Sequence, residues 1–268
     1  KYHDMEEWNW WFVSRRKTIH SLLEGADKKA KILDIGCAGG PLLNELKNAG
    51  YENAAGADFS AEAVEKCKSR GLMAYQMDAH QLDFPKDTFD LLIASDSLEH
   101  LEFDEKALAN WHSILKPGGR ILVFVPAYMF LWSEQDTVNF HFRRYTKTNL
   151  VEKMERAGFE IKRKGYWNFG VFFPTAIFRV LQRWKNKIFP SKEAKDQLSG
   201  FGGFSNKVLS GWMNLENGIF PQLTTLQKRK GKNSLGRTVV PAGSFTTGRA
   251  LGVRDDNDLV AIGAGLLL

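Results

Sequence analysis

The stretch KILDIGCAGG, residues 31–40, joins a short apolar run to a glycine-rich turn. The run AKILDIG (30–36) predicts a buried strand, and PLLNELKNAG (41–50) predicts an amphipathic helix. Glycines between a strand and a helix let the backbone turn tightly and approach a ligand, and the helix start favours an anionic group. Five residues of this turn are candidate ligand contacts: Asp34, Gly36, Cys37, Ala38 and Gly40.

Apolar runs and amphipathic stretches alternate along the following hundred residues. Further strands are predicted at 52–60, 72–79, 89–97 and 120–127. Helices are predicted at 60–71 and 105–119, the second broken by Pro117-Gly118, and after the fifth strand at 146–158. Such alternation predicts right-handed βαβ units and an α/β, doubly wound, Rossmann-like sheet.

Two aspartates stand at the ends of the second and third predicted strands. Asp58 is placed to accept both hydroxyls of a ribose, and Asp78, followed by Ala79, is placed to meet an adenine edge. Because the carboxyl ends of parallel strands share one edge of a sheet, these residues and the glycine turn are expected to lie together. The joint pattern is more specific than any one of its parts.

Taken together, KILDIGCAGG, GADFS, MDAHQLDFPKDTFDLLIASDSLEHL and ILKPGGRILVFVPA resemble the class I S-adenosylmethionine (SAM)-dependent methyltransferases, in the small-molecule group called type 11 or 12. The resemblance covers about residues 30–165. It implies a seven-stranded sheet, mostly parallel with an antiparallel last strand. The segments 159–167 and 258–268 fit the last two strands, with an aromatic and basic insertion between them.

The resemblance also implies how SAM is bound. Asp34, Gly36 and Gly40 would shape the loop around its methionine part, and Asp58 would hold the ribose. Phe59, Asp78 and Ala79 would meet the adenine, and Ser95 would line the sulfonium. Ala38 is a departure, because many members have glycine there.

Four parts of the chain follow from this pattern. Residues 1–29 are expected to form an N-terminal helical lid, and 30–165 the SAM-binding core. Residues 166–257 are an insertion or acceptor cap, and 258–268 the last strand. In the lid, Trp11 and Arg15 lie four residues apart and therefore on one helix face, placed either to close over SAM or merely to pack on the sheet.

His100 is a candidate catalytic base, because an imidazole titrates near neutral pH. The alternative is a structural histidine in the loop after the fourth strand. Asp96, Glu99 and His100 also resemble the carboxylate and histidine set with which some quinone-pathway O-methyltransferases hold a divalent ion. Such clusters are mostly solvated loops, so no metal is expected.

The acceptor is expected to meet a loop after the fifth strand, through His141, Arg143, Arg144 and Tyr145. Two arginines can clamp a phosphate or carboxylate. The alternative is salt bridging to the acidic front half of the chain. Residues 1–140 carry a net charge of −7 and residues 141–268 a net charge of +13.

The basic back half includes residues 166–190, where aromatic and cationic side chains alternate. This mixture suits a membrane interface or a lipid-linked acceptor, or else a hairpin covering the sheet or a dimer contact. We expect small-molecule or lipid-linked acceptors, no nucleic acid, and a cytoplasmic protein with possible peripheral membrane contact. Two cysteines and an acidic, aromatic start fit that compartment.

The expected function is methyl transfer from SAM, most of all to oxygen. One alternative is a SAM-fold module that docks on membranes or partners without catalysis. A nicotinamide dehydrogenase is disfavoured, because the glycines at 36, 39 and 40 do not fit G-x-G-x-x-G. Methylation of nucleic-acid bases is weakened by Ser95-Asp96-Ser97-Leu98, which replaces the Asn/Asp-Pro-Pro-aromatic run of that class.

Overall fold

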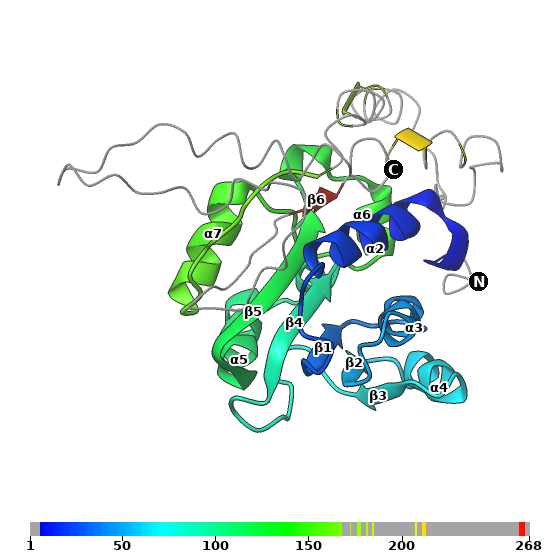
Figure 1. Ribbon diagram of the computed structural model, residues 1–268. Coiled ribbons are helices and arrows are strands. Elements are labelled where there is room, and N and C mark those ends of the chain that lie inside the picture. The colour runs from blue at the N-terminus through cyan, green and yellow to red at the C-terminus, as the bar shows by residue number, and fades with distance from the viewer. Residues whose placement is uncertain are drawn as a thin grey trace, which may run out of the picture.

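A computed structural model describes residues 6–167, the strand residues 263–265 and single helical positions at 172, 176, 177, 181, 184, 207, 211 and 212. A parallel sheet lies at its centre, with the strand order β3-β2-β1-β4-β5-β6 (Figure 1). The strands are β1 (Ile32–Ile35), β2 (Ala54–Asp58), β3 (Met73–Gln76), β4 (Phe89–Ser95), β5 (Leu115–Pro126) and β6 (Gly263–Gly265). The strand order reverses between β1 and β4, where open α/β sheets bind their ligands.

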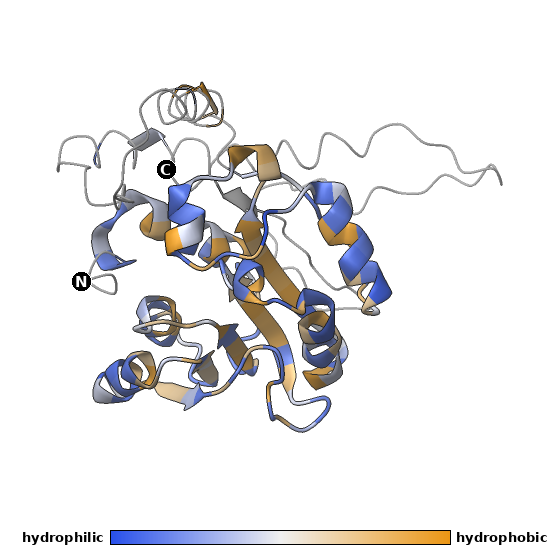
Figure 2. Cartoon of the chain, turned by 180° about the vertical axis from the view of Figure 1, so that it is seen from behind, coloured by the Kyte–Doolittle hydropathy of each residue, from blue (hydrophilic) through white to orange (hydrophobic). Residues whose placement is uncertain are grey.

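Helices cover both faces of this sheet. They are α2 (Trp10–Leu22), α3 (Pro41–Asn48), α4 (Ala61–Ser69), α5 (Asp104–Ile114), α6 (Glu134–Val138) and α7 (Lys147–Arg156), with 3₁₀ turns η1 (Leu98–His100) and η2 (Met129–Leu131). Neighbouring residues of β4 serve opposite faces: Ile93 packs with α2 and α3, whereas Leu92 packs with α5 and α7. The central strands are therefore mostly apolar, as Figure 2 shows, while the helices are polar on their outer sides.

Local sequence explains where several helices begin and end. The Ser60 hydroxyl accepts a hydrogen bond from the Ala63 amide at the start of α4, and Thr146 caps α7 in the same way. The helix α5 ends at Ile114, before Pro117 rather than at it, and Leu115 already begins β5. A register shift between Phe89 and Leu91 accommodates the Pro-Gly-Gly turn in β5.

The segment 159–167 does not form the predicted strand; within this described stretch the backbone is irregular. Its aromatic residues explain the difference. Trp167 packs on Trp11 of α2 with ring centroids 5.2 Å apart, and Tyr166 stacks on Tyr128 at 5.2 Å. These contacts hold the end of the segment against the N-terminal helix rather than at the sheet edge.

The predicted antiparallel last strand also needs correction. Within the range 258–268 the structure describes only Gly263–Gly265, and this strand runs parallel to β5, with Phe124 beside Gly263. An antiparallel direction would follow from a hairpin with a strand at 159–167, which the described residues lack. Six strands are described instead of seven.

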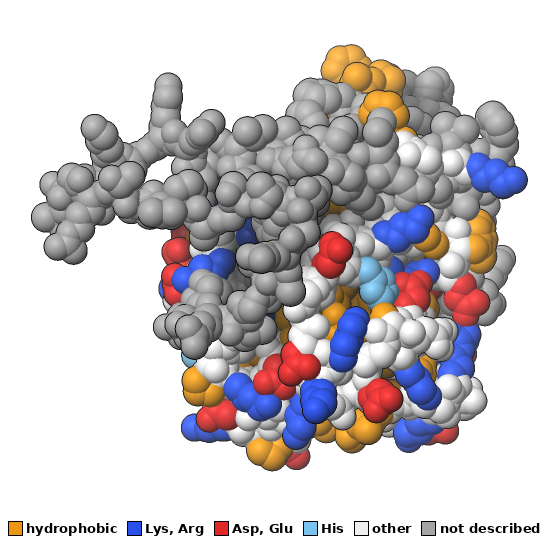
Figure 3. Space-filling view, in the orientation of Figure 1, with side chains coloured by type: hydrophobic (Ala, Val, Ile, Leu, Met, Phe, Trp, Pro, Cys, Tyr) orange, Lys and Arg blue, Asp and Glu red, His pale blue; other side chains and the backbone are white. Residues whose placement is uncertain are grey.

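Several predictions fall outside the described residues: the first five residues of the expected lid, nearly all of the 166–257 insertion and most of 258–268. Among the residues searched, no helix is both long and apolar enough to cross a bilayer. On the face seen in Figure 3, the described acidic and basic side chains are intermixed rather than separated into patches.

Candidate active site

A cleft of about 780 Å³ opens at the carboxyl edge of β1, β2 and β4, beside α2. It gathers residues from distant parts of the sequence. Most of the predicted cofactor contacts line it: Asp34, Gly36, Cys37, Ala38, Asp58, Phe59, Asp78, Ala79, Ser95 and Arg15. The predicted residues His100 and His141 line it as well, while Trp11 and Gly40 are not part of its lining.

The loop between β1 and α3 has a left-handed backbone at three positions: Gly36 (φ +75°), Ala38 (φ +48°) and Gly40 (φ +81°). A Cβ on Gly36 would lie 2.5 Å from the Ser97 hydroxyl oxygen, so glycine is required there for space as well as for conformation. Ala38 adopts the conformation that favours glycine, which explains why glycine is the common residue at this position in the resembling sequences.

Asp58 connects this loop to the next helix. One of its carboxylate oxygens accepts a hydrogen bond from the Ala38 amide at 2.9 Å, and the other accepts one from the Ser60 amide at 2.9 Å. Each oxygen keeps lone-pair capacity for a further donor. The carboxylate is thus fixed at the cleft by the protein itself, in a position suited to ribose hydroxyls.

Asp34 lies at the floor of the cleft and is buried. Burial raises the pKa of its carboxyl from 3.8 to about 7; Arg15 opposes this rise, and the negative charges of Asp58 and Glu6 add to it. Asp34 is consequently poised to lose its proton when a positively charged group enters the cleft.

The far side of the cleft carries the predicted adenine contacts. The Asp78 carboxylate accepts hydrogen bonds from the His80 amide and ring, both at 2.8 Å, and the amide bond is the main reason why its pKa is lowered. The Trp111 indole donates to the Ala79 carbonyl at 2.9 Å, fixing the backbone there. Phe59 is 77% exposed and offers a free aromatic face.

The helix α2 is joined to the β4 end through Asp96. The Arg15 guanidinium forms an ion pair with the Asp96 carboxylate, and the Trp11 indole donates to the same oxygen at 3.4 Å. The four-residue spacing of Trp11 and Arg15 therefore brings both to one acceptor. Only Arg15 reaches the cleft, since Trp11 is buried against Trp167.

Two histidines face the other end of the cleft. The His141 Nδ1 lies 3.0 Å from the Asp136 carboxylate, and the rings of His100 and His141 meet edge to face at 4.6 Å. His100 is exposed at the cleft, whereas His141 is buried. The pKa of His100 is lowered to about 4 by loss of hydration and by His141, although the Asn139 main chain opposes the shift.

Arg143, Arg144 and Tyr145 are not among the residues that line the cleft, and their binding of an acceptor stays a prediction. Arg144 is buried and donates to both Asp136 oxygens, at 2.7 and 2.9 Å. Arg143 pairs with Asp104 at 2.8 Å, and the Tyr145 hydroxyl donates to the same carboxylate at 2.8 Å. Both arginines thus form salt bridges with aspartates of the acidic front half, which is the alternative that the sequence left open.

Sequence reasoning missed Asp136, on which this region depends. Its carboxylate also accepts a hydrogen bond from the Ser133 amide, forming a capping box at the start of α6. These bonds keep its pKa well below the usual value although burial acts in the opposite direction. The spacing Ser133-x-x-Asp136 is a capping-box signal that the sequence offered.

Such a cleft at the strand reversal point, with a glycine turn and a fixed carboxylate, defines an α/β protein that binds a nucleoside-containing cofactor. Residues 9–164, more than half of the chain, match the methyltransferase domain family. The chain belongs to this family, whose members are SAM-dependent methyltransferases of the class I fold. SAM is accordingly its cofactor.

Curated relatives cover parts of the same region. The chain is 27% identical over 161 residues to 2-methyl-6-phytyl-1,4-hydroquinone methyltransferase 2 of Oryza sativa subsp. japonica, covering 56% of this chain and 46% of the relative. It is 35% identical over 116 residues to demethylmenaquinone methyltransferase of Thermus thermophilus, covering 41% and 52%. The chain thus spans about half the length of these relatives.

One solved structure shares the fold over a larger part of the chain. The [4+2]-cyclase SpnF superposes with a TM-score of 0.51 at 19% identity, covering 80% of this chain and 77% of that one. This likeness concerns the fold alone. A shared fold hosts different chemistries, so the reaction has to be argued from the site.

Proposed function

We propose that the protein transfers the SAM methyl group to a hydroxyl oxygen of a small or lipid-linked acceptor. The observation that carries this proposal is the arrangement of the cleft. Its Asp34, Asp58 and Asp78 end suits the ammonium, ribose and adenine of SAM, and its other end carries His100 and His141. The reacting methyl would then lie between these two ends.

In this reaction the acceptor oxygen forms a bond to the methyl carbon while the bond from sulfur to that carbon breaks. The bonding electron pair stays on sulfur and gives S-adenosylhomocysteine. The acceptor loses its hydroxyl proton, for which we propose His100 as the first acceptor, because it lines the cleft and is neutral at pH 7. Its pKa of about 4 makes it a weak base, so the proton must pass on to solvent. The protein contributes chiefly by holding the two reactants in line.

The nature of the acceptor is proposed from the lining at the histidine end. Apolar side chains lie there, namely Leu101, Val138 and Phe140, and Phe140 is 82% exposed. Such a rim suits an aromatic ring or a lipid tail. Two relatives are named for a phytyl hydroquinone and for demethylmenaquinone, which supports an acceptor of this kind.

The cofactor half is tested by calorimetry with SAM and S-adenosylhomocysteine. We expect dissociation constants of about 1 μM, equivalent to about 8 kcal/mol. Asp58→Ala should weaken binding by roughly 1–3 kcal/mol, because charge-assisted hydrogen bonds to ribose are lost. Binding of NADH but not of SAM would overturn the proposal.

The acceptor half is tested by S-adenosylhomocysteine release with hydroquinones that carry no tail, a short tail or a long prenyl tail. We expect turnover with at least one of them and a lower KM as the tail lengthens, and Phe140→Ser should reduce this dependence. Product NMR distinguishes O-methylation from ring C-methylation. SAM binding without turnover on any hydroxylated acceptor would favour the non-catalytic docking module.

Peripheral membrane contact also remains a proposal, because the segment that motivates it, 166–190, lies almost wholly outside the described residues. Flotation with anionic and with neutral vesicles tests it. Cationic attraction predicts stronger binding to anionic vesicles, and weaker binding in high salt. Protein found only in the soluble fraction with both lipids would exclude it.

A further inference from the structure

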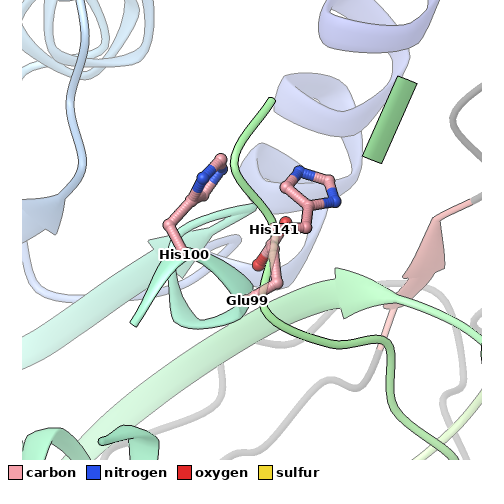
Figure 4. Close-up of side chains that lie close together, drawn as sticks. All are labelled: Glu99, His100 and His141. Carbon is pink, nitrogen blue, oxygen red and sulfur yellow. The ribbon is translucent and has the colours of Figure 1, made fainter. Parts of the chain in front are cut away.

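Three potential metal ligands converge where η1 meets the loop that follows α6. They are Glu99, His100 and His141, and one ligand atom from each lies within 4.8 Å of the other two. Figure 4 shows the two imidazole rings and the Glu99 carboxylate gathered beside that loop. The main chain ties the parts together, because the Phe142 amide donates to the Glu99 carbonyl at 2.8 Å.

The Glu99 side chain is fully buried, and neither of its carboxylate oxygens has a hydrogen-bond partner among the described residues. Most buried polar atoms in proteins have such a partner, and a carboxylate without one is costly to bury. Burial raises the pKa of Glu99 to about 8 and outweighs the charges of Arg15 and Arg144, which favour the ionised carboxylate. Neither arginine donates a hydrogen bond to Glu99. Arg15 pairs with Asp96 and Arg144 with Asp136. The site therefore has unmet capacity for a cation.

One ring nitrogen of His141 is held by a carboxylate, because its Nδ1 lies 3.0 Å from Asp136. The Asn139 main chain acts on the His100 ring and favours its protonated form. Metal-binding histidines are oriented in this way, with a carboxylate or carbonyl on one nitrogen while the other nitrogen binds the ion. The Arg144 guanidinium donates hydrogen bonds to Asp136, so the carboxylate that orients the His141 ring is itself fixed in place.

We propose that Glu99, His100 and His141 bind a divalent transition-metal ion of the zinc or manganese type. Two imidazoles and one carboxylate form a donor set for such ions, and three protein ligands leave a position open for substrate. Both histidines line the cleft, so the open position faces the proposed acceptor end. Bond lengths of about 2 Å place tetrahedral ligand atoms about 3.3 Å apart, so ion binding would draw these atoms together by up to about 1.5 Å.

This ligand set differs from the Asp96, Glu99 and His100 set considered from the sequence. Asp96 is engaged by Arg15 and Trp11, whereas His141, forty residues further along, completes the site. The proposal rests on the proposed function only for the role of the ion, which would bind the acceptor hydroxyl and ease its deprotonation. With the ion bound, His100 is a ligand and does not itself take the proton, so the ion would replace it in that step. Ion binding itself is independent of that role.

Cobalt(II) is the probe for the test, because it replaces zinc and gives visible absorption bands when imidazoles bind it. The full chain, freed of metal with a chelator, is titrated with Co²⁺ while absorption is recorded. We expect one equivalent to bind with new visible bands. Glu99→Gln and His141→Gln should each weaken binding by roughly tenfold or more, because each removes one ligand.

The matched control is His20→Gln, which removes a histidine paired with a carboxylate, Glu45, outside the site. It should leave Co²⁺ affinity within about threefold of the parent, a change below 1 kcal/mol. SAM binding measured on every variant reports folding and separates this proposal from the cofactor proposal. Absence of visible bands in the parent, or equal Co²⁺ affinity in the parent and in both folded ligand variants, would overturn the metal site.

Discussion

Asp34 shows how one buried carboxyl links cofactor binding to pH. Its pKa of about 7 leaves it partly protonated near neutrality, and the SAM ammonium would favour the ionised form. We predict that SAM binding at about pH 6.5 releases a fraction of a proton, and that affinity rises with pH up to about 7. Calorimetry in buffers of different ionisation enthalpy measures the release.

The control is Asp34→Asn, which should bind SAM more weakly and without buffer dependence. Its stability supplies a second readout. Because its pKa is raised on folding, Asp34 lowers the free energy of unfolding at pH values above about 7 and has no such effect below about 3.8. Asp34→Asn should therefore stabilise the cofactor-free protein more at pH 8 than at pH 5. The rise of the Asp34 pKa from 3.8 to about 7 limits this gain in unfolding free energy to about 4 kcal/mol. A binding enthalpy identical in all buffers would contradict the prediction.

Gly36 allows backbone strain to be separated from steric conflict. Gly36→Ala should cost about 1–2 kcal/mol for the left-handed conformation and more for displacing Ser97, whose hydroxyl donates to the Ile35 carbonyl at 2.6 Å. We predict at least a roughly tenfold loss of SAM affinity, since the cofactor loop must move. Calorimetry measures the affinity, and denaturant unfolding measures the stability.

Gly25 provides the matched comparison, because it has φ +83° and a Cβ there would meet nothing within 4 Å. Gly25→Ala should lower the free energy of unfolding only by the cost of the left-handed conformation, and it should keep normal SAM affinity. Equal losses of affinity in the two variants would show that the Ser97 contact is unimportant.

At the scale of elements, the short helix α6 and the loop after it depend on one buried ion pair. Arg144→Gln leaves Asp136 buried with a missing partner, so we predict a loss of about 3 kcal/mol in unfolding free energy. Arg143→Gln, at a partly exposed pair, should cost less than about 1 kcal/mol. Denaturant unfolding compares them. A raised acceptor KM with unchanged stability in Arg144→Gln would support the acceptor-clamp hypothesis.

Elements whose sequence carries both a pattern and a local signal could be predicted closely. The helix α4 combines apolar spacing with the Ser60 cap, and β4 has an apolar run, residues 91–94, between two covered faces. The segment 159–167 has the composition of a strand, but Tyr166 and Trp167 find aromatic partners distant in sequence. Tertiary contacts of this kind override a local strand pattern.

At the scale of the whole molecule, the two halves of the cleft differ in how far sequence can predict them. The cofactor half follows from topology, because parallel strands place Asp34, Asp58 and Ser95 at one edge. The histidine half is built by a loop whose shape depends on the buried Asp136. No periodicity in the sequence encodes that shape, so the ion pairs of Arg143 and Arg144 with Asp104 and Asp136 could not be predicted.

The chain has two cysteines, and the structure places both directly behind the cofactor loop. The Sγ atoms of Cys37 and Cys67 lie 3.8 and 3.3 Å from the Ala38 carbonyl oxygen, and both side chains are buried. The hydrogen bond with Cys67, together with burial, raises the pKa of the Cys37 thiol and makes it slow to react.

Cys37 lines the cleft and Cys67 does not, but both side chains are almost fully buried, so we expect a thiol reagent to reach either sulfur only when the loop moves. The rate of labelling therefore reports how often the loop opens, and no engineered probe is needed. Because SAM binds the closed loop, we predict that saturating SAM slows labelling by roughly the factor by which it stabilises that conformation, about 100-fold at a hundred times its dissociation constant. Mass spectrometry of timed aliquots follows both sites, and labelling that ignores SAM would mean that the thiols are reached by another route.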